Sequence, residues 1–178
     1  MIEVFVESIR VNMTNYKRVV MLKEKTAPRY LPIWIGHFEA DAIAIPMQKV
    51  PVSRPLTHDL LRAAISALGA RLERVVINDL ADETFYAKLI LDQDGKSLEV
   101  DARPSDAIAL AIRTEVPIYV EDKVLDSAGM VFDTEEEVER EARRENEAPV
   151  DEAKLSVFKQ FINTLDIGDE EKEKGEGK

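Results

Sequence analysis

Side chains that could bind an anion and move a proton gather at the start of a predicted helix over residues 101–113. They are Asp101, Arg103, Ser105 and Asp106. Pro104 suits the first helical position because it lacks an N–H group and its φ is already helical. The free N–H groups and the positive dipole end of a helix start favour an anion, and a guanidinium matches the geometry of a phosphate. This helix start is therefore the predicted functional centre.

A second polar group lies at the start of a predicted helix over residues 56–68. Arg54 stands before a proline, as Arg103 does, and His58 is a side chain that can accept or donate a proton near neutral pH. Carboxylate oxygens are ligands for Mg²⁺ or Mn²⁺, and the candidate metal ligands are Asp59, Asp101 and Asp106. No organic cofactor is predicted. The candidate catalytic residues are His58, Asp59, Asp101 and Asp106, and the candidate substrate-binding residues are Arg54, Arg103, Thr57 and Ser105.

Each of these residues also has a purely structural interpretation. Acidic residues in a first turn, as Asp59 and Asp106 would be, stabilise a helix through its dipole. The two arginines could form ion pairs with Asp59 or Asp101. Thr57 is predicted to be an N-cap and Ser105 to be a first-turn hydroxyl. His58 could be a first-turn surface or capping residue, and Glu39 could cap the first helix. No spacing in the chain forms a known zinc or calcium motif, so the residue types alone leave both interpretations open.

The composition indicates a globular chain with one substantial core. The chain has 178 residues, of which 45% are hydrophobic and 33% are charged. It has no cysteine, which excludes disulfides, thiolate metal sites and cysteine nucleophiles. The first residues alternate like a strand and do not resemble a signal peptide, and no apolar run approaches the roughly 20 residues of a membrane helix. A cytoplasmic location without membrane contact is therefore expected.

The net charge of −11 is unevenly distributed along the chain. Residues 134–178 contain 15 acidic and 8 basic side chains, so this quarter of the chain carries −7. The rest lacks the basic surface of an ordinary nucleic-acid binder, so any polyanion would need local arginines or bridging cations. Residues 133–178 are predicted to be an acidic, partly helical C-terminal extension with one amphipathic helix over residues 151–165.

The apolar pattern predicts an α+β fold. Strands are predicted over residues 2–11, 16–25, 30–35, 72–79, 84–91, 98–101 and 117–120. Helices are predicted over residues 39–45, 56–68 and 101–113, with a helical turn over residues 122–128. Pro46 is expected to end the first helix, because proline clashes with the preceding turn.

An internal repeat is predicted from this order of elements. A shift of 65 residues places Asp41-Ala-Ile-Ala44 on Asp106-Ala-Ile-Ala109, and the strands upstream keep their register. Each half then consists of three strands followed by a helix. The predicted fold is two strand–strand–strand–helix repeats that form one curved, mostly antiparallel, barrel-like sheet with packed helices.

Four segments of the chain match the motifs of a known family. They are Leu31-Pro-Ile-Trp-Ile-Gly36, Glu39-Ala-Asp-Ala-Ile-Ala44, Arg54-Pro-Leu-Thr-His-Asp-Leu60 and Asp101-Ala-Arg-Pro-Ser-Asp-Ala-Ile-Ala-Leu110. With these segments the chain resembles the bifunctional nuclease family over about residues 1–132, the predicted first domain. The resemblance implies two strand-rich repeats each closed by a helix, homodimers, and nuclease activity on DNA and RNA.

Three hypotheses follow from the residues and the resemblance. The first is a nuclease, assisted by a divalent metal, that hydrolyses phosphodiester bonds in DNA and RNA. The second is a non-catalytic dimeric module that binds a phosphorylated ligand or nucleic acid through the same polar groups. The third is a structural dimer in which these residues are caps and ion pairs. The resemblance alone ranks the nuclease first.

Overall fold

The computed structural model describes residues 1–12 and 16–131. The acidic extension and its predicted helix over residues 151–165 lie outside this part, and the domain boundary after residue 132 stays a prediction. Within the described residues, no helix is long and apolar enough to cross a membrane.

Eight strands form one mostly antiparallel sheet. They are β1 (Ile2–Val11), β2 (Arg18–Glu24), β3 (Arg29–Ile35), β4 (Ala70–Ala81), β5 (Thr84–Gln93), β6 (Lys96–Ala102), β7 (Ile118–Val120) and β8 (Met130–Val131). Their order is β6-β5-β4-β7-β1-β2-β3-β8, and β4 and β7 run parallel to each other. Over the described residues the sheet is open, with β6 and β8 at its edges. The α+β class is therefore confirmed, whereas a barrel-like form is not.

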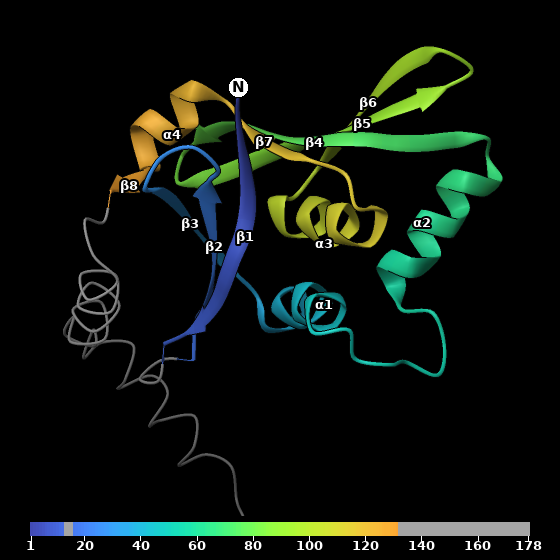
Figure 1. Cartoon of the computed structure of the whole chain (residues 1–178), viewed down its shortest axis with the longest axis horizontal. Coiled ribbons are helices and arrows are strands. Elements are labelled where there is room, and N and C mark those ends of the chain that lie inside the picture. Colours follow the sequence, from blue (N-terminus) through green and yellow to red (C-terminus); the bar gives the residue numbers. More distant parts are fainter. Residues whose placement is uncertain (13–15, 132–178) are drawn as a thin grey trace, which may run out of the picture. The chain divides into compact units, whose positions relative to one another are not determined.

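Helix α3 (Pro104–Thr114) is at the centre of the core. Residues 107–111 are buried, and the alanines among them have small side chains that let neighbouring elements approach closely. It packs against α1 (His37–Met47), α2 (Thr57–Ala67) and the strands β4 and β5. Figure 1 shows α3 between the sheet and α1, with α2 beside it. The short α4 (Asp122–Ala128) packs elsewhere, against β3 and β4.

The predicted end of the first helix before Pro46 is wrong. α1 continues to Met47 and contains Pro46 in its last turn. A proline has no N–H group, so the carbonyl of Ala42, four residues earlier, loses its usual partner inside the helix. The guanidinium of Arg113 on α3 donates a hydrogen bond to that carbonyl at 2.6 Å. This replacement lets α1 continue past the predicted end.

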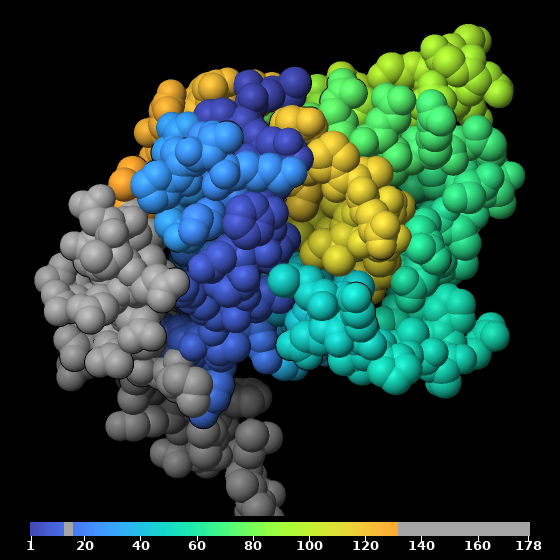
Figure 2. All heavy atoms as spheres, in the orientation of Figure 1, coloured from blue at the N-terminus to red at the C-terminus, as the bar shows by residue number. Residues whose placement is uncertain are grey.

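The helix predicted over residues 56–68 is confirmed as α2, but its apolar side is exposed. No residue of α2 is buried, and the side chains of Leu60 and Leu68 are 65% and 74% exposed. In Figure 2, α2 and the chain beside it form part of the surface at the right-hand side. Several large apolar side chains exposed in one place favour contact with another molecule.

Three strands and a helix occur twice in the element order. β1, β2, β3 and α1 are followed, after α2, by β4, β5, β6 and α3. The bounds of β3 and β6, and those of α1 and α3, differ by 67 residues at both ends. This offset pairs Glu39 with Asp106, whereas the sequence match at 65 residues paired Asp41 with Asp106. The duplication itself stays a prediction.

Candidate functional site

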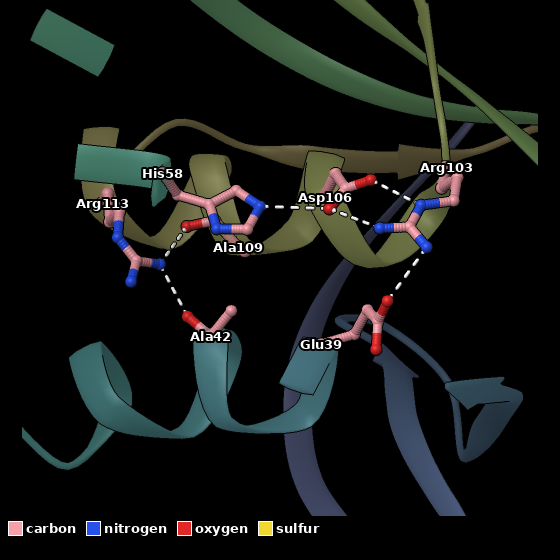
Figure 3. A network of polar contacts seen from close by, with 7 residues as sticks. All are labelled: Glu39, Ala42, His58, Arg103, Asp106, Ala109 and Arg113. Atoms are coloured by element: carbon pink, nitrogen blue, oxygen red, sulfur yellow. Dashed lines mark hydrogen bonds and ion pairs between the residues drawn. The ribbon is translucent and has the colours of Figure 1, made fainter. Parts of the chain in front are cut away.

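The starts of three helices converge on one polar network. Asp106, in the first turn of α3, accepts hydrogen bonds from His58 Nε2 at 3.1 Å and from Arg103 Nε at 2.7 Å. Arg103 Nη2 also donates to Asp106 at 3.1 Å, and its Nη1 donates to Glu39 of α1 at 2.9 Å. Figure 3 shows these contacts running from α2 through α3 to α1. The network joins an imidazole, a guanidinium and two carboxylates.

The acidic residues of this region occupy equivalent helical positions. Glu39, Asp59 and Asp106 are the third residues of α1, α2 and α3. A carboxylate there stabilises the helix dipole and can reach the backbone N–H group just before the helix. Asp59 does so, because its Oδ2 accepts from the N–H of Leu56 at 2.8 Å. The carboxylates of Glu39 and Asp106 instead accept hydrogen bonds from the side chain of Arg103, so they lie next to this guanidinium and not against the backbone before their helices.

Burial and hydrogen bonding oppose each other at Asp106. Burial raises the pKa of this carboxyl, but the hydrogen bonds and charges of Arg103 and His58 outweigh burial and hold the pKa below its ordinary value of 3.8. Asp106 is therefore ionised near neutral pH. An ionised acceptor at Nε2 keeps a proton on that nitrogen, so in the neutral imidazole Nδ1 carries the lone pair. His58 is only 12% exposed, so its orientation is restrained.

The network opens onto a pocket of about 310 Å³ between α1 and the starts of α2 and α3. Its polar lining is Glu39, Asp41, Thr57, His58, Arg103 and Asp106, and its apolar lining is Phe38, Ala42, Ile45 and Leu56. Arg103 is 64% exposed and donates three of its five N–H groups to the two carboxylates, so within residues 1–12 and 16–131 two remain for a ligand. The pocket therefore places guanidinium N–H donors next to apolar side chains.

A second arginine, Arg113, ties the same three helices together from inside. Its Nε donates to Asp59 at 2.8 Å, and its Nη1 donates to the carbonyls of Ala42 and Ala109 at 2.6 Å and 2.8 Å. The side chain is only 4% exposed. Figure 3 shows it between α1 and α3, close to the start of α2. Because Asp59 directly follows His58, this contact fixes the turn that carries the imidazole.

Asp59 should contribute to the acid stability of the protein. The N–H of Leu56 lowers the pKa of this carboxyl, burial acts against that effect, and Arg113 lowers the pKa further, so that it lies below 3.8. A folded-state pKa below the unfolded value stabilises the fold above about pH 4, and this stability is lost as the pH falls through the folded-state value. In Asp59→Asn the melting temperature should therefore fall less steeply than in the wild type as the pH is lowered below about 4.

Thermal unfolding followed by circular dichroism at several pH values measures this difference. Asp101→Asn is the matched control, because Asp101 is exposed on β6 and belongs to no such turn. Equal slopes for Asp59→Asn and the wild type would contradict the assignment of acid stability to Asp59.

The structure brings four of the eight predicted site residues to the pocket and places the others outside it. Inside are Thr57, His58, Arg103 and Asp106, and outside are Arg54, Asp59, Asp101 and Ser105. Asp101 is exposed on β6, opposite Lys88 of β5. Ser105 is buried in the first turn of α3, and Arg54 is exposed in the connection between α1 and α2. The predicted cap at Thr57 is wrong by one residue, because Leu56 is the N-cap of α2.

The three predicted metal ligands do not form a cluster. Over residues 1–12 and 16–131, no group of three or more His, Cys, Asp or Glu side chains is placed to hold a metal ion. Asp59 is bound by Arg113, Asp106 is bound by Arg103, and Asp101 does not line the pocket. These residues do not fit a divalent ion held by the protein alone. A divalent ion at this pocket would need substrate oxygens among its ligands.

Sequence reasoning considered Glu39 as a helix cap near the repeat-related Asp41 but did not include it among the predicted site residues, and it did not identify Arg113. A signal for Glu39 was present, since Gly36 stands three residues before it. A Cβ atom at Gly36 would lie 2.1 Å from Glu39 Oε2, so the glycine leaves room for the carboxylate that accepts from Arg103. For Arg113 the sequence predicts only a basic side chain in the last turn of a helix, where it interacts favourably with the helix dipole. Nothing in the sequence indicates that its side chain turns inward.

Comparison with known proteins shows that the chain is similar to one family. A model of the bifunctional nuclease domain matches residues 20–133, which include the whole pocket. An uncharacterized protein of Mycobacterium tuberculosis is 46% identical over 168 residues, 94% of this chain and 96% of that protein. Bifunctional nuclease 2 of Oryza sativa subsp. japonica is 30% identical over 115 residues, 63% of this chain and 35% of that protein. Bifunctional nuclease 2 of Arabidopsis thaliana is 28% identical over 125 residues, 67% of this chain and 38% of that protein.

Proposed function

Because the chain belongs to the bifunctional nuclease domain family, we propose that it is a nuclease that hydrolyses phosphodiester bonds in DNA and RNA. The observation that carries this proposal is the contact of Asp106 with both His58 and Arg103 at the pocket. Phosphodiester hydrolysis needs a base for the attacking water and a positive group for the phosphate. The network supplies one of each. The names of the plant relatives support the same activity.

His58 is the proposed general base. Its Nε2–H group donates to Asp106, so Nδ1 is the nitrogen that takes a proton from water. The imidazole becomes a cation in this step, and the ionised carboxylate of Asp106 stabilises that charge. The water oxygen forms a bond to phosphorus while the bond from phosphorus to the leaving oxygen breaks. A solvent proton then neutralises the leaving oxygen.

Arg103 is the proposed phosphate ligand. The hydrogen bond and charge of Asp106, followed by the hydrogen bond of Glu39, raise the pKa of the guanidinium, so Arg103 stays positive. Its two unused N–H groups are free to donate to phosphate oxygens. Thr57 lies beside His58 at the pocket and contributes a hydroxyl. Arg54 is exposed in the connection before α2 and is proposed to contact the backbone of the nucleic acid away from the cleaved bond.

The charge balance of the pocket supports the predicted role of a divalent ion. The lining contains one arginine and three carboxylates, those of Glu39, Asp41 and Asp106. A phosphate would be repelled by these carboxylates unless His58 is protonated or a cation arrives with the substrate. A requirement for Mg²⁺ or Mn²⁺ therefore stays a prediction, with no protein ligand assigned.

Cleavage of labelled oligonucleotides tests the proposed activity. The full chain is incubated with single- and double-stranded DNA and RNA in Mg²⁺, Mn²⁺ or EDTA. We expect cleavage by the wild type and a large loss in Arg103→Ala, shown to be folded by circular dichroism. Cleavage of equal rate in both proteins would indicate a contaminant or another site. Saturable binding with no turnover would support the alternative of a non-catalytic dimeric module.

A homodimer formed through α2 is a further part of the proposal. Its support is the exposed apolar side chains Leu60, Leu61 and Leu68. The variant Leu60→Asp/Leu61→Asp should have half the molar mass of the wild type in light scattering, because two buried carboxylates would disfavour the contact. Val131→Asp, at an exposed position of β8, is the control and should stay dimeric. A monomeric wild type would contradict the dimer.

The cytoplasmic location also stays a prediction.

A further inference from the structure

One wall of the candidate pocket is mostly apolar, with one carboxylate, and the proposed chemistry does not use its apolar side chains. Four residues of α1 line this wall at positions i, i+3, i+4 and i+7, which places them on one side of the helix. They are Phe38, Asp41, Ala42 and Ile45. Leu56 faces them from the residue before α2. One side of α1 therefore forms this wall, and the side chain of Leu56 lies opposite it.

Phe38 is the most exposed part of this wall. Phe38 is 81% exposed, and its ring lies in a T-shaped arrangement with the His37 ring, with the centroids 5.4 Å apart. The same pocket contains the guanidinium of Arg103 and the imidazole of His58. An open aromatic face next to an anion-binding group fits a ligand that is flat and apolar at one end and anionic at the other.

We propose that Phe38, Ile45 and Leu56 form a subsite that stacks the nucleobase next to the phosphate held by Arg103. This inference rests on the proposed function and adds the part of the substrate that the apolar wall recognises. Exposed aromatic rings stack bases of any sequence, because every base has a π face. The pocket of about 310 Å³ lies at the lower end of the range of ligand pockets, roughly 300–1,000 Å³, which suits one nucleotide.

Asp41 sets the direction in which such a nucleotide lies. A carboxylate only accepts hydrogen bonds, so it repels a phosphate but can accept from the amino group of a base. Asp41 is on the same side of α1 as Phe38, whereas Arg103 comes from the start of α3. The base therefore lies along α1 and the phosphate lies toward Arg103. Since bases inside a duplex are covered by their neighbours, the subsite takes unpaired nucleotides.

Fluorescence quenching in Mg²⁺ tests the subsite without any turnover, because the two probes have no phosphodiester bond to cleave. The variant Phe38→Trp is made in a Trp34→Phe background, so that it carries the single tryptophan of the chain. Adenosine 5′-monophosphate should quench this tryptophan in a saturable way, and ribose 5-phosphate, which has the same phosphate but no base, should not. Equal effects of the two probes, or none of either, would overturn the proposal.

Substitution of Phe38 tests the subsite in the oligonucleotide complex. Phe38→Ala should raise the Kd for a single-stranded oligonucleotide, and the KM for its cleavage, roughly tenfold, because a stacked base contributes about 1–3 kcal/mol. Phe38→Tyr should restore both values. Replacing the bases by abasic sites should weaken wild-type binding and have little effect on Phe38→Ala. Tyr86→Ala, which removes an exposed aromatic side chain of β5 outside the pocket, is the control.

The two experiments separate this inference from the proposed nuclease activity. Binding that depends on the base and on Phe38, without any cleavage, keeps the subsite and rejects the nuclease. Cleavage with a KM that is the same in Phe38→Ala and in the wild type keeps the nuclease and rejects the subsite.

Discussion

Replacing His58 by alanine should lower the rate of phosphodiester cleavage by roughly 10²- to 10⁴-fold, the usual contribution of a positioned acid or base. The fold should survive, because Asp106 keeps two hydrogen bonds from Arg103 when the imidazole is removed. The loss should appear in kcat, since the imidazole acts on the attacking water and the phosphate is held by Arg103. Single-turnover cleavage of a labelled oligonucleotide measures it.

Asp106→Asn should lower the same rate by a comparable factor. An amide at this position is neutral, so it neither stabilises an imidazolium nor keeps the proton of His58 on Nε2. If the two residues act as a unit, the double variant should be little slower than the slower single variant. Additive losses would show instead that they act in separate steps.

His37→Ala is the matched control for His58→Ala. The chain has two histidines, and both lie in the first turn of a helix. His37 is more than half exposed, faces Asp41 and does not line the pocket. Its loss should leave cleavage close to that of the wild type. An equal effect of both substitutions would remove His58 from its proposed role.

The helix starts were predictable from sequence to within a few residues, because local rules determine them. Pro104 fits the first position of α3, and the acidic third residues of the helices follow the preference of carboxylates for the positive end of a dipole. The side chains of Asp106 and Arg103 are three residues apart on one turn, so their contact also follows from local geometry. The approach of His58 and Glu39 to this turn depends on helix packing, which no local rule provides.

The contacts between residues far apart in the sequence were not predictable, because they depend on how the helices pack. Asp101 and Asp106 are close in sequence, but the end of β6 and the first turn of α3 direct them to different places. The opposite holds for Arg113 and Ala42, which are 71 residues apart and in direct contact. Pro46 shows how the two levels interact. Local sterics predict that it ends the helix, and a distant arginine changes that outcome.

Replacing Arg113 by methionine should destabilise the protein by about 3 kcal/mol, near the lower end of the cost of breaking a buried ion pair. The lower end is expected because water can reach Asp59, whose side chain is about a quarter exposed. For a chain of this length the melting temperature should fall by roughly 6–12 °C. Arg62→Met is the control, because Arg62 is exposed, donates one hydrogen bond to the carbonyl of Arg113 and acts on Asp59 through its charge. It should shift the melting temperature by no more than about 2 °C.

The loss in Arg113→Met should be partly reversed by a change on another helix. Without the guanidinium, the carbonyl of Ala42 loses this donor, and Pro46 cannot supply the N–H group that a helix normally provides at this position. Pro46→Ala restores that group. It should therefore stabilise Arg113→Met by about 1–2 kcal/mol more than it stabilises the wild type, a difference that a double-mutant cycle measures. A cycle that closes with no coupling would mean that Arg113 acts through Asp59 alone, and that α1 tolerates its proline for another reason.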